Sequence, residues 1–253
     1  MGERVQLFST CVGDLVFPQT VTDAVSLLSR VAFQVDFPPE QVCCGQPAFN
    51  AGHRRAARRV ARTLDRAFSR DVPIVAPSGS CVAMVAHHLP ELVGCAPLPI
   101  FELSALLAER DAPLENVNAG RTLAYHDSCH MLRELGIADA PRRLLERTGA
   151  TLVPLPRPDL CCGFGGTFAV RQPEISIAMA DEKLAGAASV DALVTADPGC
   201  LMHLRARAER TGGPPLVSLA TALARGASEI PSSRSMWHES WYASVRPSLT
   251  GSS

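Results

Sequence analysis

The cysteines of this 253-residue chain fall into two sets of four that share one register. Cys11, Cys43 and Cys44 recur 118 residues later, and Cys81 recurs 119 residues later. The first set is Cys11, Cys43, Cys44 and Cys81, and the second is Cys129, Cys161, Cys162 and Cys200. Cys95 is left without a counterpart. Repetition at a long, fixed period predicts two copies of one structural unit, each carrying four thiols.

Each half of the repeat shows strands that alternate with helices. Short apolar or alternating runs predict the strands, and apolar residues at helical spacing predict the helices. The second half follows the order of the first and adds one more strand and helix. The predicted strands are 5–9, 33–37, 74–76, 121–125, 151–155, 192–195 and 216–218. The predicted helices are 21–32, 54–68, 82–92, 141–147, 174–187, 201–210 and 220–225.

This alternation predicts an α/β fold with two pseudo-repeated βαβ halves and parallel sheets. Every repeated cysteine follows a predicted strand, so we expect the cysteines at the carboxyl ends of the strands, where such sheets gather ligands. We place the first repeat at 1–115 and the second at 116–227. The remainder, 228–253, is predicted to be a loose tail except where Trp237 and Trp241 find a surface to pack on.

Four thiolates per half can hold either an iron–sulfur cluster or a closed zinc site. Structural zinc modules carry ligands in pairs roughly two to four residues apart, and this chain has no Cys-x-x-Cys. The same absence disfavours a thioredoxin-type dithiol and a bacterial ferredoxin cluster. Adjacent cysteines followed by Gly45 or Gly163 instead direct two sulfurs at one compact inorganic core. We therefore favour iron–sulfur clusters, keep zinc open for one half, and assign Cys95 to packing.

Weaker candidates flank the cysteines. Residues 163–166, including Gly165 and Gly166, can donate backbone N–H groups to a cluster or form a plain turn. Residues 78–80 fit an anion-binding nest or a helix cap equally well. His126 and His130 lie on either side of Cys129, and we favour a solvent-facing or hydrogen-bonding role for them over iron ligation.

Charge offers little guidance about partners, because 25 acidic and 24 basic residues nearly cancel. This balance gives no electrostatic reason to expect nucleic acid or a membrane surface as the main partner. The arginine-rich helix 54–68 is interpreted as a solvated face, with docking of an acidic protein as the alternative. The chain shows no secretion signal and no transmembrane segment, so we expect a cytoplasmic protein whose thiols stay reduced and available for metal.

Three short segments and the repeated spacing resemble a known family. The segments are 77–81, 126–129 and 161–168, and the spacing is Cys, some 30 residues, Cys-Cys-Gly, some 36 residues and Cys, given twice. This pattern is similar to the cysteine-rich CCG domain family, over about residues 4 to 225. The family includes the heterodisulfide reductase B subunit, the glycolate oxidase iron–sulfur subunit and lactate utilization protein A. The short form of the last, which lacks a ferredoxin domain, is the most similar.

The resemblance implies that each set of four cysteines binds a metal group. In the heterodisulfide reductase branch a closing Cys-x-x-Cys supplies a fifth thiolate, which holds a non-cubane pair of fused clusters. Here Ser78 and Asp197 occupy the corresponding position, which disfavours that cluster and disulfide chemistry. An ordinary 4Fe-4S cluster, a cluster with an oxygen ligand and a zinc-binding half stay open. The candidate cofactor contacts are Gly45, Gly163, Gly165, Gly166, Ser78 and Asp197.

The function implied by the resemblance is an iron–sulfur electron-transfer subunit of a cytosolic complex that oxidises L-lactate to pyruvate. Its partners would be the other iron–sulfur and small accessory subunits, because the chain has no Gly-x-Gly-x-x-Gly fingerprint for a nicotinamide or flavin. No catalytic residue is assigned. Two alternatives stay open: a catalytic subunit of the heterodisulfide reductase type, and a zinc-bound structural scaffold.

Overall fold

The computed structural model describes residues 2–227, so the predicted tail with Trp237 and Trp241 lies outside the described residues. Across residues 2–227, every helix is too short or too polar to cross a bilayer. The strands are β1 (Arg4–Leu7), β2 (Gln34–Asp36), β3 (Ile74–Ala76), β4 (Ile100–Glu102), β5 (Thr122–His126), β6 (Thr151–Leu152), β7 (Ala192–Thr195) and β8 (Leu216–Ser218).

The helices connect these strands in the order that the repeat predicts. They are α1 (Cys11–Val16), α2 (Pro18–Arg30), α3 (Gln46–Asn50), α4 (Arg54–Ala67), α5 (Gly79–Ala83), the π-helical turn η1 (Met84–His88), α6 (Leu89–Val93), α7 (Leu103–Glu109), α8 (Cys129–Arg133), α9 (Asp139–Arg147), α10 (Thr167–Arg171), α11 (Pro173–Ala185), α12 (Pro198–Thr211) and α13 (Leu219–Ala224).

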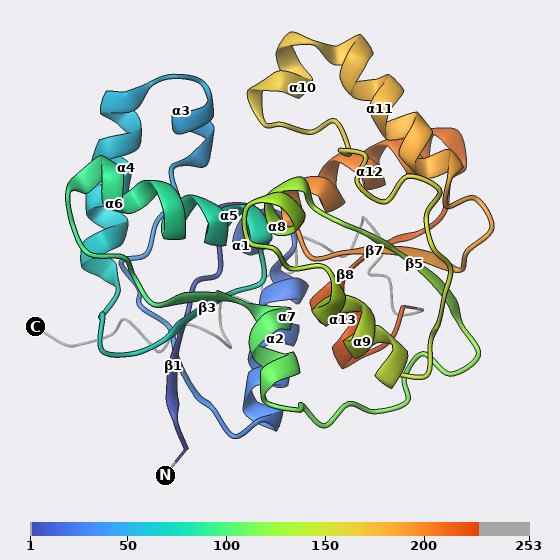
Figure 1. Ribbon diagram of the computed structural model, residues 1–253, viewed down its shortest axis with the longest axis horizontal. Helices are drawn as coiled ribbons and strands as arrows, with labels where there is room; N and C mark the ends of the chain where they lie inside the picture. The colour runs from blue at the N-terminus through green and yellow to red at the C-terminus, as the bar shows by residue number, and fades with distance from the viewer. Residues whose placement is uncertain (1, 228–253) are drawn as a thin grey trace, which may run out of the picture.

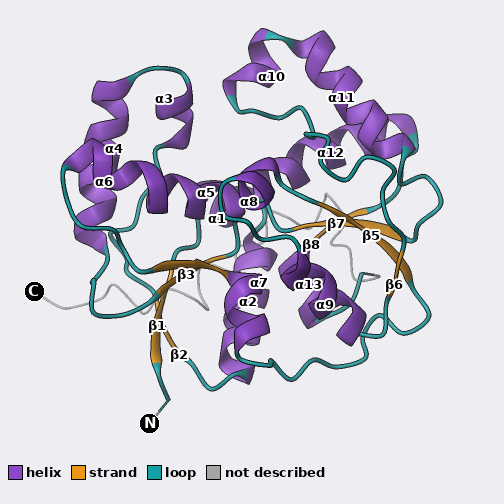
Figure 2. Ribbon diagram, in the orientation of Figure 1, coloured by secondary structure: helices purple, strands orange, loops and turns teal. Residues whose placement is uncertain are grey.

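The strands form two parallel four-stranded sheets with one topology. The first sheet has the order β2-β1-β3-β4 and the second β6-β5-β7-β8, so each strand of the first has its counterpart four strands later (Figure 2). All paired neighbours run parallel. The predicted α/β fold in two pseudo-repeated halves is confirmed.

One hydrophobic core is shared between the halves. Helices α2 and α7 cover one face of the first sheet, α9 and α13 cover one face of the second, and α2 packs on α13 while α7 packs on α9 (Figure 1). These two helix pairs are counterparts in the repeat, so the halves meet like the subunits of a symmetric dimer. This core includes residues from both sides of the predicted boundary between residues 115 and 116, so it does not divide the chain there. The boundary stays a prediction.

Side-chain size explains the close contact between α2 and α13. Most side chains of α13, Leu-Ala-Thr-Ala-Leu-Ala, are small, and Leu223 is completely buried. On α2, Leu27 and Leu28 face it from the apolar stripe that helical spacing predicts. Burying a leucine contributes about 1.5–3 kcal/mol, so this contact holds the halves together. Two smaller cores lie on the outer faces, beneath α4 and α6 and beneath α11 and α12.

Local differences from the predicted elements have steric causes. The predicted helix 82–92 is interrupted by η1, directly before Pro90, which has no N–H to donate to the preceding turn. The predicted strand 151–155 is reduced to β6, because Pro154 cannot join the hydrogen-bond ladder. The sequence analysis missed β4, a three-residue edge strand that follows Pro99.

Candidate metal centre

The first set of cysteines, here called the first quartet, comes together beyond the carboxyl ends of β1, β2 and β3. Cys11 is the first residue of α1, and its Sγ lies 3.5 Å from the Sγ of Cys43. Cys44 is hydrogen-bonded to both Cys43 and Cys81, and Cys81 lies in α5. The four thiols therefore form one continuous chain of contacts.

The second quartet repeats this arrangement. Cys129 is the first residue of α8 and Cys200 lies near the start of α12. Cys161 is hydrogen-bonded to Cys129 and Cys162, and the Sγ atoms of Cys162 and Cys200 are 3.3 Å apart. The structure thus brings all eight repeated cysteines into two clusters, with the membership that the repeat predicts.

A glycine follows each cysteine pair and turns the backbone back toward sulfur. Gly45 and Gly163 adopt φ values of 88° and 89°, a left-handed conformation that other residues rarely accept. Their N–H groups point at Cys43 Sγ and Cys161 Sγ, at 3.5 and 3.4 Å. A backbone N–H aimed at sulfur stabilises the negative charge of a thiolate.

Each quartet prepares one cysteine as a thiolate. Hydrogen bonds from the thiols of Cys11 and Cys44 lower the pKa of Cys43 to about 3. In the second quartet, hydrogen bonds from Cys129 and Cys162 lower the pKa of Cys161 to about 2. The thiolate is the form of cysteine that binds iron or zinc. Four soft sulfur donors with one already charged fit an iron–sulfur cluster or a zinc ion, and binding either would release the remaining protons.

Both quartets open into one pocket of about 140 Å³ at the junction of the halves. Helix α1 of the first half packs on α12 of the second, and α5 packs on α8, so the cysteine-bearing helices cross over between halves (Figure 1). The pocket is lined by all repeated cysteines except Cys43: Cys11, Cys44, Cys81, Cys129, Cys161, Cys162 and Cys200. Two bound groups would therefore lie on either side of a common space.

Ser78 and Asp197 serve as helix caps. Ser78 Oγ accepts from the N–H of Cys81 at 3.4 Å, at the start of α5. Asp197 accepts from the N–H of Gly199 at 3.0 Å through Oδ1, and from the N–H of Ser80 at 2.8 Å through Oδ2. One carboxylate thus joins α12 to α5 across the pocket. Their assignment as cofactor contacts stays a prediction.

Gly165 and Gly166 lie in the loop that walls the pocket beside the second quartet. Both have positive φ values, 48° and 62°, and Gly166 directly precedes α10. The ring of Phe164, in the same loop, covers Gly199, where an added Cβ would come within 2.8 Å of the ring. The predicted contact between these glycines and a bound cluster stays a prediction.

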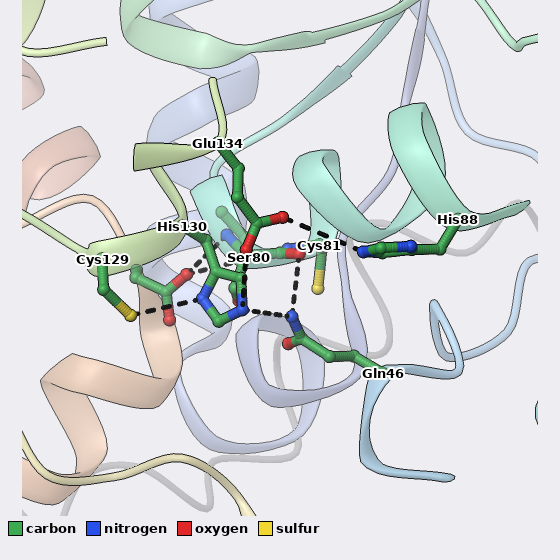
Figure 3. Close-up of polar contacts among 9 residues, drawn as sticks. Gln46, Ser80, Cys81, His88, Cys129, His130 and Glu134 are labelled. Atoms are coloured by element: carbon green, nitrogen blue, oxygen red, sulfur yellow. Dashed lines mark hydrogen bonds and ion pairs between the residues drawn. The ribbon is translucent and has the colours of Figure 1, made fainter. Parts of the chain in front are cut away.

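A polar network crosses the pocket from one half to the other (Figure 3). His130 Nδ1 lies 3.5 Å from Cys129 Sγ, and its Nε2 lies 3.1 Å from Gln46 Nε2, which also donates to the carbonyl of Ser80 at 3.3 Å. The amide nitrogen of Gln46 can only donate, so Nε2 accepts in this contact and Nδ1 is the ring nitrogen left to carry a proton toward the sulfur. Glu134 lies 3.6 Å from the same ring.

His130 could be predicted from its position next to Cys129, but three other polar residues of the network could not: Gln46 and Glu134, which contact His130, and His88, which lies 4.0 Å from Glu134. They belong to no recognised motif, and only Gln46, directly after Cys-Cys-Gly, carried a positional signal.

His126 lies on the other side of the second quartet. Its ring is completely buried, and neither ring nitrogen has a hydrogen-bond partner within residues 2–227. Its donor atom lies within 4.8 Å of the Sγ atoms of Cys162 and Cys200. Burial lowers the pKa of His126 to about 3, so the ring is neutral. The sequence associated this histidine with Cys129, whereas the fold directs it at the other pair.

Cys95 and the arginine-rich helix lie apart from the pocket. Cys95 is half-buried against the outer core of the first half, and its Sγ lies 3.4 Å from the Asp65 carboxylate. Helix α4 buries Ala57, Ala61 and Leu64 and exposes its arginines, in agreement with a solvated face.

The comparisons with known proteins agree with this geometry. The sequence pattern of the Cysteine-rich domain, CCG, matches residues 5–86 and 123–205, one match in each half. Proteins named lactate utilization protein A are similar to the chain. The one from Geobacillus kaustophilus is 43% identical, covering 83% of this chain and 94% of its own. The one from Halalkalibacterium halodurans is 40% identical, covering 83% and 92%.

Among solved structures, the aspartate racemase of Picrophilus torridus is similar with a TM-score of 0.36 and 12% identity, covering 88% of this chain and 91% of the racemase. A likeness of that size carries no conclusion. The two CCG matches and the lactate utilization relatives do carry one, since they extend over most of the chain. The chain belongs to the cysteine-rich CCG domain family, alongside the proteins named lactate utilization protein A.

Proposed function

We propose that this chain is an iron–sulfur electron-transfer subunit of a cytoplasmic complex that oxidises L-lactate to pyruvate. The observation that carries the proposal is the pair of cysteine quartets with one geometry on either side of one pocket. The names of relatives at 43% and 40% identity support lactate as the substrate of the complex. The clustered thiols of a cysteine-rich domain support a metal or iron–sulfur cofactor.

The cofactor we propose is one 4Fe-4S cluster in each quartet. Four thiolates match the four irons of such a cluster, and the N–H groups of Gly45 and Gly163 already point at sulfur. Hydrogen bonds of this kind raise the reduction potential, because they stabilise the reduced, more negative cluster. Zinc in one half remains the alternative for the quartet that would not take up iron.

The proposed role is a two-step electron relay. Oxidation of L-lactate to pyruvate releases two electrons and two protons, whereas each cluster accepts one electron at a time. Two clusters on either side of one pocket can take the pair in succession and pass it on. The hydrogen atoms themselves would be removed on a partner subunit, and the other iron–sulfur and small accessory subunits of the complex would supply and receive the electrons.

The shared pocket supports a second candidate, a reductase whose cluster attacks a substrate disulfide. Its volume, about 140 Å³, accommodates a small group beside Cys161 and Cys162. The absence of a fifth cysteine in each motif counts against it, because Ser78 and Asp197 at that position bind backbone N–H groups instead. Turnover of a disulfide by the isolated, reduced chain would favour this candidate over the relay.

The proposal is tested by asking whether L-lactate, acting through the assembled complex, reduces the clusters of this chain. The chain is purified without oxygen together with the partner subunits of the proposed complex, L-lactate is added, and the electron paramagnetic resonance of the clusters is followed. We expect lactate to produce reduced-cluster signals, and Cys161→Ser to lose them from the second quartet. Cys95→Ser is the matched control and should behave like the unmodified chain, because Cys95 contacts Asp65 rather than a quartet. A complex that oxidises lactate while its clusters stay silent would overturn the proposal.

A further inference from the structure

The second quartet has a neighbour that the first lacks. His126 ends β5, its ring is completely buried, and both ring nitrogens are without a partner among the described residues. A neutral imidazole carries one N–H donor and one lone pair, so two hydrogen-bonding groups are left unsatisfied. An unsatisfied buried polar group costs about 1–3 kcal/mol, which makes a structural role an inadequate explanation for this histidine.

The sulfurs lie where the ring can reach a group bound to them. The donor atoms of His126, Cys162 and Cys200 are mutually within 4.8 Å, yet the histidine makes no hydrogen bond with either sulfur in the described chain. A metal bonds to sulfur at about 2.3 Å and to an imidazole nitrogen at about 2.0 Å. Donor atoms at this spacing therefore leave room for a metal or a cluster edge between them.

Lys183, the single lysine of the chain, acts electrostatically on this histidine. Lys183 is buried, and its Nζ donates to the carbonyls of Arg157 and Pro158 at 2.7 and 3.2 Å. Its positive charge favours a neutral imidazole and an anionic group at the sulfurs. A neutral ring keeps the lone pair that a metal needs.

The repeat supplies an internal comparison. The residue 118 positions before His126 is Phe8, equally buried, whose ring packs edge-on against Phe68 at 5.6 Å between centroids. The fold therefore accepts an apolar ring at this point of the strand. A polar ring at the counterpart position, without a hydrogen-bond partner in residues 2–227, indicates a ligand at the second quartet.

We infer that His126 contacts the metal group of the second quartet through a ring nitrogen, as a fifth donor that the first quartet lacks. The inference rests on the proposed metal-binding function of the quartets. It makes the two sites chemically unequal: one surrounded by sulfur alone, and one with sulfur and nitrogen. Such a nitrogen, bonded to a metal or hydrogen-bonded to a sulfide, changes the potential and the magnetic signature of the second group.

The test detects the nitrogen directly. Protein labelled with ¹⁵N-histidine is purified without oxygen and reduced, and the pulsed electron paramagnetic resonance spectrum is searched for ¹⁵N coupling. We expect coupling in one of the two cluster signals, and its loss in His126→Phe, the variant that copies Phe8. The size of the coupling separates a directly bonded nitrogen from a hydrogen-bonded one. Unchanged coupling in His126→Phe with iron retained would overturn the inference.

Two controls keep the result interpretable. His130→Asn is examined in parallel, because His130 lies 3.5 Å from Cys129 Sγ and could contribute its own coupling. Loss of the coupling in His130→Asn with retention in His126→Phe would also overturn the inference. If His126→Phe loses its fold, His126→Gln, which keeps a polar side chain, takes its place and should lose the ¹⁵N coupling as well.

A cobalt titration separates failure of this inference from failure of the proposed function. If the purified chain contains no iron or sulfide, the electron-transfer function is wrong, but His126 can still be tested with Co²⁺ alone. Metal-free protein is titrated with Co²⁺, and the visible bands report the donors. We expect His126→Phe to shift the bands of one site and to leave the other unchanged. Identical spectra for the variant and the unmodified chain would overturn the inference independently of iron.

Discussion

The two halves of this molecule share their sulfur geometry but not what surrounds it. Strand order, cysteine placement and the glycine that follows each cysteine pair are the same in both. Buried positions at the carboxyl ends of the strands differ in charge and hydrogen-bonding capacity. The differing counterparts are Phe8 and His126, Ser9 and Asp127, Ser78 and Asp197, and Glu102 and Ser218.

This contrast shows which features a metal-binding repeat must keep. Removing any one thiol would leave a bound group without a ligand, so the quartets stay intact. A neighbouring residue only adjusts charge and hydrogen bonding, so it can change as long as its local partners change with it. Asp127, for example, is paired with Arg142, whereas the hydroxyl of its counterpart Ser9 donates to the side-chain oxygen of Gln41. The following predictions test whether the halves are as independent as this view requires.

The largest effect is expected from removing one thiolate per half. Cys43→Ser should lose the metal group of the first quartet and Cys161→Ser that of the second, because each is the charged sulfur of its set. Each variant should retain about half of the iron, on the basis of one four-iron cluster per quartet. Iron analysis and the resonance spectrum measure this. Loss of all iron in either variant would show that the quartets do not fold or load independently.

Breaking the buried Arg142–Asp127 ion pair of the second half should lower the free energy of unfolding more than breaking the neutral Ser9–Gln41 hydrogen bond of the first half. Arg142 donates to both carboxylate oxygens of Asp127, at 2.8 and 2.6 Å, and Asp127 is only 4% exposed. Arg142→Ala leaves a buried charge and should lower the free energy of unfolding by about 3 kcal/mol. Ser9→Ala should cost about 1 kcal/mol, the value of an ordinary hydrogen bond. Anaerobic urea unfolding measures both, and equal losses would contradict the comparison.

Glu102 should give the first half a pH effect that its counterpart Ser218 cannot give the second half. Glu102 caps α7 and Ser218 caps α13 at the same point of the repeat. Burial raises the pKa of Glu102 from 4.5 to about 7. The folded chain thus holds this proton more tightly than the unfolded one. The contribution of Glu102 to the free energy of unfolding is therefore complete below about pH 4.5 and is lost as the pH rises through about 7.

Between about pH 5 and about pH 8, Glu102 contributes a loss of about 3 kcal/mol. The free energy of unfolding of the unmodified chain minus that of Glu102→Gln should fall by this amount, because the pH effects of His126, Cys43 and Cys161 are common to both chains and cancel in the difference. Urea unfolding at the two pH values measures the difference. Ser218→Ala is the matched control: its cost should be the same at both pH values, because a serine hydroxyl does not titrate. A difference between the two chains that is the same at both pH values would contradict this assignment to Glu102.

The smallest loss of stability is expected from removing the two helix caps beside the quartets, Asp197 and Ser78. Asp197→Ala removes bonds to α12 and to the N–H of Ser80, and should cost about 2 kcal/mol. Ser78→Ala removes one bond to Cys81 and should cost about 1 kcal/mol. Iron content should stay unchanged in both variants, since both side chains bind backbone N–H groups. Iron loss in Asp197→Ala alone would instead identify it as a ligand of the second group.

Much of the fold could be predicted from the sequence because the cysteine repeat fixes the order of elements. The strands 74–76, 192–195 and 216–218 agree with β3, β7 and β8 to the residue. The edge strand β4 was missed, although its counterpart β8 was found, so applying the repeat in both directions would have located it. The crossed packing of α1 on α12 and of α5 on α8 had no local signal, because it depends on contacts between the halves.

The cysteines of the site could be predicted from the sequence, but the polar residues that surround them could not. Equal spacing identifies the eight cysteines without any structure. The direction of a side chain is a different matter: His126 precedes Cys129 by three residues, yet it lies near Cys162 and Cys200 because β5 ends beneath them. Gln46 reaches His130 only because the halves meet at the pocket. Such contacts follow from tertiary packing, which spacing along the chain does not encode.

The central claim is that both quartets hold iron–sulfur clusters, and the most direct measurement is the metal and sulfide content of protein purified without oxygen. Iron and acid-labile sulfide should be present in equal amounts, with about four of each per quartet, and zinc should be absent. Zinc at one ion per quartet, with neither iron nor sulfide, would contradict the account and leave a structural scaffold in place of a relay.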